Sequence, residues 1–307
     1  MKLSVVTTLY KSERFVEEFY NRIIRVILEL TNNYEIVFVN DGSPDRSCEK
    51  VLSIRQKDSK VKLIDLSRNF GHHYAIQAGL SIVQGDVIFL IDCDLETPPE
   101  VLNELHAVFE SEGTFDVVYA YQESRKGGWF ERVSGNIFYS FLNRLSETPI
   151  PRNILTERLM TKKYVDSLLS LGDSNLFLGG MMYWVGFNQK GVAIEKSQRE
   201  GKSTYTVRKR LSLLVNAVTS FSGKPLTWLF RFGITISVFS FLSGLILVSV
   251  KLYYGDQIQV GWTSLLVVNI LILGIVSTFL GVMGIYIYKI FKQVQSRPNF
   301  IIKKRYD

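Results

Sequence analysis

The sequence predicts an α/β fold in which a mostly parallel sheet flanked by helices is followed by a transmembrane hairpin of two helices. Up to about residue 225, short apolar runs rich in Val, Ile and aromatic residues alternate with stretches of helical periodicity. Beyond that point, residues 226–250 and 263–288 contain a single charged residue, Arg231. The chain therefore divides into a globular part and an apolar part.

Five short runs in the globular part are expected to be strands. They are residues 3–10, 34–40, 61–67, 86–92 and 115–121. Helices are expected over residues 13–30, where apolar residues recur at helical spacing, and over residues 72–85, closed by Gly85. Nearly continuous apolar strands that alternate with helices are typical of a parallel sheet covered on both faces. Ligands bind such sheets beyond the carboxyl ends of the strands.

The two apolar runs are each long enough to cross a bilayer, which needs ~20 apolar residues in a helix. Lys and Arg precede the first run and follow the second, whereas the loop between them contains only Lys251 and Asp256 as charged residues. The positive-inside rule then places both termini and the globular part in the cytoplasm. A pair of buried core helices is the alternative, which uncharged runs of this length disfavour.

These observations predict six segments along the chain. They are a globular domain over 1–207, an amphipathic juxtamembrane segment over 208–225, a transmembrane helix over 226–250, an external loop over 251–262, a second transmembrane helix over 263–288 and a basic cytosolic tail over 289–307. The juxtamembrane segment could lie against anionic lipid headgroups or pack on the globular domain.

The overall composition limits the classes of function. Hydrophobic residues make up 47% of the chain and the formal net charge is +7, a pairing that suits a membrane-associated protein. A nucleic-acid-binding protein could share the charge but not the long apolar runs, so nucleic acid is not expected as a partner. Cys48 and Cys93 lie far apart without a CxxC spacing, so neither a zinc site nor a disulfide is expected.

Asp92 and Asp94 stand at the end of an apolar strand and precede Thr97-Pro98-Pro99. We expect the backbone to turn there, so that both carboxylates face the carboxyl rim of the sheet. Mg²⁺ takes hard oxygen ligands, commonly one or two carboxylates together with phosphate oxygens of a substrate. The pair therefore predicts a site for Mg²⁺ or Mn²⁺ and a nucleoside diphosphate, with solvated surface acids as the alternative.

Three further stretches could take part in binding. Asp41, after the second strand, could accept a hydrogen bond from a ribose hydroxyl or a base N–H, or it could belong to an ordinary Asp-Gly turn. Arg68 could contact a phosphate, while His72 and His73 are interpreted as polar residues at a helix start. Residues 198–205 could form an anion-binding loop near the bilayer or a solvated basic loop.

Five stretches, in this order, resemble motifs of the family 2 glycosyltransferases of GT-A fold. They are "SVVTTLYKSE", "EIVFVNDGSPD", "LSRNFGHHYAIQAGL", "DCDLETPPE" and "REGKSTY". With the paired apolar runs, they are most similar to the membrane-anchored polyprenyl-phosphate glycosyltransferases. That group includes bacterial undecaprenyl-phosphate glucosyltransferases and dolichyl-phosphate mannose synthases.

The resemblance implies an inverting hexosyltransferase that uses a nucleotide sugar, with UDP-glucose as the first expectation. The acceptor would be undecaprenyl phosphate, and the product would supply surface-glycan modification of the O-antigen type. The resemblance also implies a multi-pass protein of the bacterial inner membrane, in contact with membrane lipids and able to assemble as a homo-oligomer, a tetramer in some relatives.

Site residues follow from the matching positions. The resemblance implies catalytic roles for Asp92, Asp94, Arg199 and Glu157, with the two aspartates also binding the metal. It implies substrate-binding roles for Thr8, Tyr10, Glu13, Asp41, Arg68, Arg125, Arg132, Arg158, Ser203 and Tyr205. Of these, Asp41 would contact the nucleoside, and Arg199 and Ser203 would lie near the acceptor phosphate.

One departure from the family pattern bears on catalysis. Thr156 occupies a position where relatives often have an acidic residue, and Glu157 stands beside it. Either Glu157 substitutes for that acid or the activity is altered. A GDP-mannose-dependent synthase, a transferase with a saccharide acceptor and a degenerate transferase acting as a membrane scaffold remain as alternatives.

Overall fold

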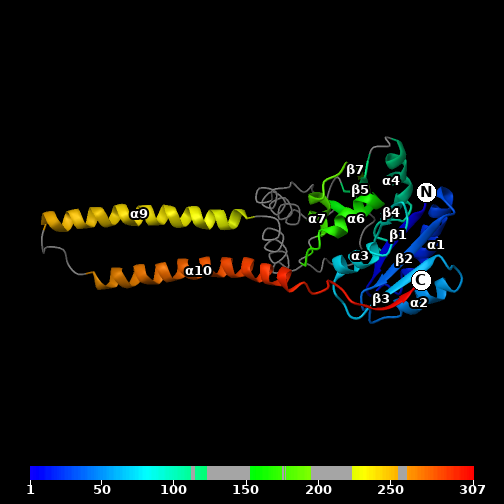
Figure 1. Ribbon diagram of the computed structural model, residues 1–307, viewed down its shortest axis with the longest axis horizontal. Coiled ribbons are helices and arrows are strands. Elements are labelled where there is room, and N and C mark those ends of the chain that lie inside the picture. Colours follow the sequence, from blue (N-terminus) through cyan, green and yellow to red (C-terminus); the bar gives the residue numbers. More distant parts are fainter. Residues whose placement is uncertain (112–114, 123–152, 175, 177, 195–222, 255–260) are drawn as a thin grey trace.

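The computed structural model describes residues 1–111, 115–122, 153–174, 176, 178–194, 223–254 and 261–307. Within them, eight strands form one sheet in the order β7-β5-β6-β4-β1-β2-β3-β8 (Figure 1). The strands are β1 Leu3–Leu9, β2 Tyr34–Asn40, β3 Val61–Leu66, β4 Val87–Leu90, β5 Val117–Tyr121, β6 Ile154–Thr161, β7 Gln189–Ala193 and β8 Ile302–Tyr306. The helices are α1 Val16–Leu30, α2 Ser47–Arg55, α3 His72–Leu80, α4 Val101–Ser111, α6 Lys162–Ser170, α7 Leu178–Trp184, α9 Lys224–Tyr254 and α10 Trp262–Gln295.

The sheet is mostly parallel, as predicted. Strand β1 pairs in parallel with β2 and β4, β2 pairs in parallel with β3, and β5 pairs in parallel with β7. Only β6 and β8 run the other way, each antiparallel to its neighbours. The carboxyl ends of β1, β2, β3 and β4 therefore lie at one edge of the sheet, which we call the rim.

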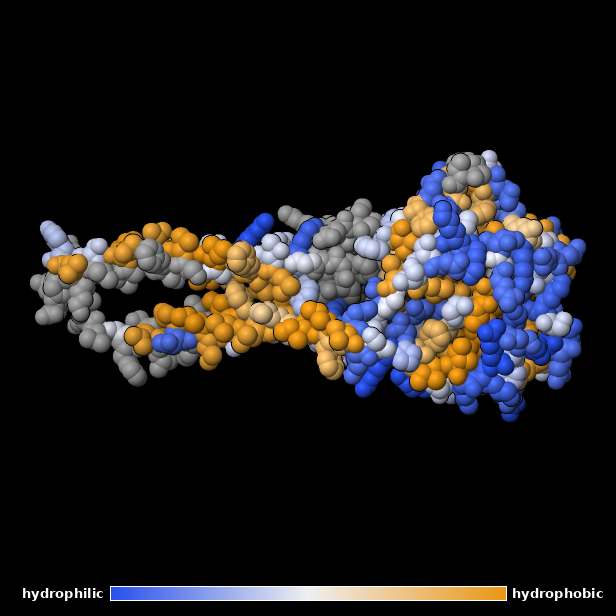
Figure 2. Space-filling view, in the orientation of Figure 1, coloured by the Kyte–Doolittle hydropathy of each residue, from blue (hydrophilic) through white to orange (hydrophobic). Residues whose placement is uncertain are grey.

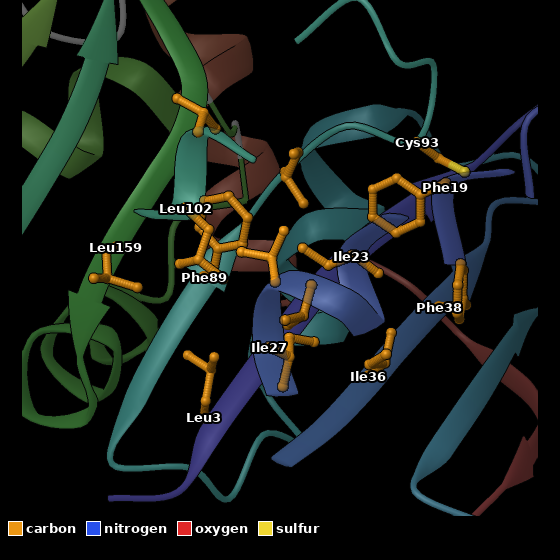
Figure 3. Packing of buried hydrophobic residues seen from close by; sticks show 14 of the residues in the cluster. Leu3, Phe19, Ile23, Ile27, Ile36, Phe38, Phe89, Cys93, Leu102 and Leu159 are labelled. Carbon is orange, nitrogen blue, oxygen red and sulfur yellow. The ribbon is translucent and has the colours of Figure 1, made fainter. Parts of the chain in front are cut away.

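Two apolar layers sandwich the sheet because neighbouring strand residues point to opposite faces. Helices α1, α2 and α4 cover one face and α3, α6 and α7 cover the other. Figure 3 shows Phe19, Ile23 and Ile27 of α1 in the first layer, close to Phe38 of β2. The rings of Phe19 and Phe38 meet edge to face with centroids 6.0 Å apart.

Several elements differ from the sequence prediction. The helix expected over 72–85 ends at Leu80. Strands β6, β7 and β8 were not predicted. Their sequences contain charged or small residues between the apolar ones and therefore lack a continuous apolar run. The basic tail contains strand β8, which pairs with β3, so the chain returns to the globular domain after α10.

Helices α9 and α10 lie side by side and extend away from the globular domain (Figure 1). Phe232 of α9 and Phe279 of α10 contact each other with ring centroids 6.2 Å apart. Figure 2 shows mainly hydrophobic residues along this part and many hydrophilic ones on the globular end. Among the described residues, one segment, Ile272–Gln295 of α10, has the length and mean hydropathy of a membrane-spanning helix.

Candidate active site

The loops that follow β2 and β3 are tied together at the rim by Asp41. Its side chain is buried, and its two carboxylate oxygens accept hydrogen bonds from the backbone N–H groups of Phe70 (2.7 Å) and Gly71 (3.0 Å). Gly42 has a φ of +60°, and a Cβ atom there would lie 2.5 Å from the backbone nitrogen of Asn69. Only glycine permits this approach, so the Asp-Gly pair joins two rim loops.

The loops that follow β1 and β2 are joined in a similar way. The backbone N–H of Lys11 donates to Ser43 Oγ, that of Ser12 to Ser47 Oγ and that of Glu13 to Asp45 Oδ2. Burial would raise the pKa of Asp45, but hydrogen bonds from Ser43, Ser47 and the Glu13 N–H outweigh it and lower the pKa to about 2.

Glu13, predicted to bind substrate, takes part in the same connection between loops. Its Oε2 accepts a hydrogen bond from the backbone N–H of Arg46 at 3.3 Å. The structure thus gives Glu13 a role in holding the loop after β1 against the start of α2. Tyr10, two residues beyond Thr8, is 49% exposed at the rim, where a ligand can reach its ring.

Asp92 and Asp94 lie on the same side of the chain, and Cys93 explains why. Ile91 and Cys93 are buried in the layer that contains α1 and α4, while the aspartates between and after them are only partly buried. Strand β4 ends at Leu90, and Cys93 and Asp94 already lie in a turn, as the sequence led us to expect. The bend continues at Leu95, which has φ +59°, and the Glu96 N–H donates to Asp94 Oδ1.

His72 stands between the ends of β1 and β4, a position that the sequence interpretation missed. Its Nδ1 is 3.1 Å from the hydroxyl of Thr8, and its Nε2 is 3.5 Å from Asp92 Oδ1. Burial lowers the pKa of His72, against the opposing influence of Asp41, Asp94 and Glu157. A neutral ring with its proton on Nε2 donates towards Asp92 and accepts from Thr8.

His73, next to it, points elsewhere. Its Nδ1 lies 3.4 Å from the carbonyl oxygen of Leu176, and the two imidazole planes are inclined by 50°. The two residues do begin a helix, as interpreted from the sequence, and their side chains diverge. The signal that could have identified His72 is its place in the first turn of the helix after β3, directly at the rim.

Strand β6 brings Glu157 and Arg158 to buried positions beside β4. Glu157 is 2% exposed and close enough to His72 to influence its pKa. Arg158 is 4% exposed and donates hydrogen bonds to the carbonyl oxygens of Thr156 and Leu155. Thr156, on the same strand, is partly buried.

Of the remaining predicted site residues, the structure describes only Arg68. Arg68 is exposed at the end of β3, stacks on the ring of Phe70 at 4.0 Å and donates to the Asn69 carbonyl. Five others lie outside the described residues: Arg125, Arg132, Arg199, Ser203 and Tyr205. The structure thus brings Thr8, Asp41, Asp92, Asp94, Glu157 and the unpredicted His72 to one end of the sheet.

The rim offers oxygen ligands to a hard divalent cation. Among the described residues, no group of three or more His, Cys, Asp or Glu side chains is arranged to hold a metal by itself. Two carboxylates at a partly exposed edge nevertheless fit Mg²⁺ or Mn²⁺, because such ions take their remaining ligands from water and substrate phosphates. Asp92, whose side chain is 29% exposed, and Asp94 are the candidates.

Comparison with known proteins identifies the family of the chain. Residues 4–169 match the sequence profile of glycosyl transferase family 2. An uncharacterized glycosyltransferase of Bacillus subtilis, YkcC, is 39% identical over 308 residues, covering 100% of this chain and 94% of its own length. A bactoprenol glucosyl transferase from the SfII prophage of Shigella flexneri is 33% identical over 307 residues, covering 99% and 98%.

One solved structure has the same fold at low sequence identity. The mannosyltransferase PcManGT from Pyrobaculum calidifontis, determined with GDP-Man and Mn²⁺, has a TM-score of 0.51 at 14% identity. The match covers 96% of this chain and 86% of the other. Because the family profile spans more than half of the chain and the curated relatives match it from end to end, the protein belongs to glycosyl transferase family 2 and is a glycosyltransferase of GT-A fold.

Proposed function

We propose that this glycosyltransferase transfers glucose from UDP-glucose to undecaprenyl phosphate, making a lipid-linked sugar for surface glycans of the O-antigen type. The main observation behind the proposal is that one chain contains both a rim with partly exposed carboxylates and an apolar helix long enough to enter a membrane. A full-length relative named as a bactoprenol glucosyl transferase supports the choice of acceptor and sugar.

The donor would bind across the rim, with its nucleoside near Asp41 and its diphosphate near Asp92 and Asp94. Thr8 and Tyr10 would line the same pocket from the end of β1. A bound Mg²⁺ or Mn²⁺ would stabilise the charge that develops on the departing diphosphate. His72 would hold the Asp92 carboxylate in place through its Nε2, which lies 3.5 Å from Oδ1.

The acceptor needs no strong general base. A lipid phosphate is already anionic at neutral pH, because its second ionisation lies near pH ~6. One of its oxygens would attack the sugar C1 while the bond from C1 to the diphosphate oxygen breaks, with inversion at C1. The chain would contribute orientation, so Thr156 in place of an acid is compatible with catalysis.

The position of β8 supports a membrane hairpin. Strand β7, which precedes α9 in the chain, and strand β8, which follows α10, both belong to the same sheet, because β7 pairs with β5 and β8 pairs with β3. A chain that returns to the same domain crosses a bilayer an even number of times. If α10 crosses, α9 is the natural second span, since its 31 residues extend about 45 Å along a helix and it runs beside α10.

Exposed side chains on both helices fit this topology. Phe239 of α9 is 72% exposed and Leu273 of α10 is 67% exposed, and both helices contain further exposed apolar side chains. A contiguous apolar surface of this kind is typical of a membrane interaction site. The domain and both termini would then lie on the cytoplasmic side of the inner membrane, next to a lipid acceptor that cannot leave the bilayer.

The test uses purified protein in detergent with undecaprenyl phosphate, Mg²⁺ or Mn²⁺ and a panel of UDP- and GDP-sugars. Mass spectrometry would detect the lipid-linked sugar, and the expected result is a metal-dependent glucosyl product from UDP-glucose. Asp94→Asn should lose the product, whereas Glu104→Gln, an exposed carboxylate on α4, should keep it. A product only from another donor would overturn the glucose assignment, and no product from any donor would favour a scaffold.

A further inference from the structure

The end of α10 is attached to the globular domain by a small set of hydrogen bonds that lie outside the candidate active site. Gln293 Oε1 accepts from the backbone N–H of Ser174 at 2.9 Å, and Gln293 Nε2 donates to the Gly172 carbonyl at 3.1 Å. Gln293 follows Lys289 and Lys292, and the helix ends soon after at Gln295. The contact therefore lies where the apolar helix meets the polar domain.

A second side chain extends the attachment to α3. Asn299 Nδ2 donates to the Asp173 carbonyl at 2.8 Å and to Gln77 Oε1 at 3.0 Å. Ser67, after β3, donates its backbone N–H to the carbonyl of Ile301 at 2.9 Å, which starts the pairing of the tail. We use the name clamp for this set of residues: Gln293 and Asn299 together with their hydrogen-bond partners, which are residues 172–174 and Gln77.

The clamp is connected to the rim through α3. Tyr74 donates its hydroxyl to the Ser174 carbonyl at 3.0 Å, and the neighbouring His73 contacts the Leu176 carbonyl. One residue earlier, His72 contacts Thr8 and Asp92. A single short helix thus contacts the segment after α10 through Gln77 and the candidate donor site through His72 in its first turn.

We propose that Gln293 and Asn299 are positioning residues that hold the rim at a fixed place relative to the membrane helix, so that an acceptor phosphate at the membrane surface reaches the donor sugar. The proposal rests on the proposed function, because it presupposes a lipid-linked acceptor. Misplacement by about 1 Å can cost an enzyme about 10²-fold in rate, so four hydrogen bonds at this junction are sufficient to matter.

The experiment compares two acceptors with the double variant Gln293→Ala/Asn299→Ala. With undecaprenyl phosphate in vesicles of phosphatidylethanolamine and phosphatidylglycerol, the turnover number should fall about tenfold. With a short, water-soluble prenyl phosphate, the turnover number and the KM for the nucleotide sugar should stay within about twofold. Gln295→Ala, an exposed residue two positions along the same helix, should leave both reactions unchanged.

Equal losses with the two acceptors would mean a general loss of structure and would overturn the proposal, as would full activity in vesicles. Hydrogen exchange provides a readout that needs no enzyme activity. The Ser174 amide should exchange faster in Gln293→Ala than in the wild type or in Gln295→Ala, and unchanged exchange would exclude the clamp. A wild type that transfers no sugar to either acceptor would instead remove the proposed function, while the exchange measurement still decides the clamp.

Discussion

The two ends of the sheet treat buried acidic residues in opposite ways. At the amino end, Glu35 of β2 is 2% exposed, and its carboxylate accepts from Lys62 Nζ at 2.8 Å, Ser4 Oγ at 2.6 Å and the Gln84 N–H at 2.6 Å. At the rim, Asp41 and Asp94 form no ion pair with Lys or Arg among the described residues. The Glu35 carboxylate is thus matched by a protein cation, whereas Asp41 and Asp94 are not.

We propose that this difference in charge distinguishes the structural cluster around Glu35 from a binding site at the rim. A carboxylate that is matched by protein cations and donors has nothing left to attract a ligand. Several carboxylates gathered around one neutral histidine attract a cation instead, and a divalent ion brings a nucleoside diphosphate with it. We therefore expect substitutions at Asp94 and His72 to reduce activity while leaving the fold intact, and substitutions at Glu35 to do the reverse.

The largest expected effect is that of Asp94→Asn. The amide keeps the shape and the hydrogen bond from the Glu96 N–H but loses the charge that would bind the metal. We expect a loss of about 10²–10³-fold in kcat/KM for sugar transfer, with no change in the denaturant midpoint. Equal loss of stability and activity would contradict the separation of the two ends.

Glu35→Gln tests the other end of the sheet. Removing the charge leaves Lys62 beside a neutral group, so unfolding should become easier by about 2 kcal/mol. Denaturant titration in detergent, followed by tryptophan fluorescence, measures this, and the remaining folded enzyme should transfer sugar at the normal rate. A variant of full stability would show that the amino-end cluster contributes little.

His72→Ala should have an intermediate effect confined to the rim. Loss of the ring removes the contacts that hold Asp92 and Thr8 in place. Because residues that orient metal ligands typically contribute 10–100-fold to activity, we expect kcat/KM for sugar transfer to fall about tenfold. His72→Gln, which can still donate to a carboxylate, should recover part of it. His73→Gln, next to it but facing Leu176, should stay within about twofold, and a larger loss there would contradict the assignment.

Much of the fold was predictable because its central strands are almost entirely apolar. Residues 3–10, 34–40 and 61–67 contain β1, β2 and β3 within a residue or so of their ends. Strand β8, "IKKRY", has three consecutive basic residues and exists because it pairs with the edge of β3, at the far end of the chain. A pairing between residues so distant in sequence leaves no local pattern.

The candidate site was predictable in part for a similar reason. The position of Asp92 and Asp94 at the carboxyl end of a strand follows from the strand itself, so their place at the rim could be expected. His72 lies at the rim because it begins the helix after β3, but its two contacts depend on β1 and β4 being neighbours in the sheet, which brings Thr8 and Asp92 close to its ring. The double function of Asp41, as a rim carboxylate and as the acceptor for two N–H groups, likewise depends on tertiary packing.

The smallest expected effect is a pH dependence that belongs to the amino end alone. Burial would raise the pKa of Glu35, but the hydrogen bonds from Lys62, Ser4 and the Gln84 N–H, with the charge of Lys62, lower it below 4.5. The stabilisation is therefore complete above pH 4.5 and is lost as the pH falls through the lowered folded-state value. The difference in unfolding free energy between the wild type and Glu35→Gln should shrink on acidification below that point. Glu104→Gln, which removes an exposed carboxylate, should have the unfolding free energy of the wild type both above and below pH 4.5. If the difference between the wild type and Glu35→Gln instead grew in acid, the pKa of Glu35 would not be lowered by folding.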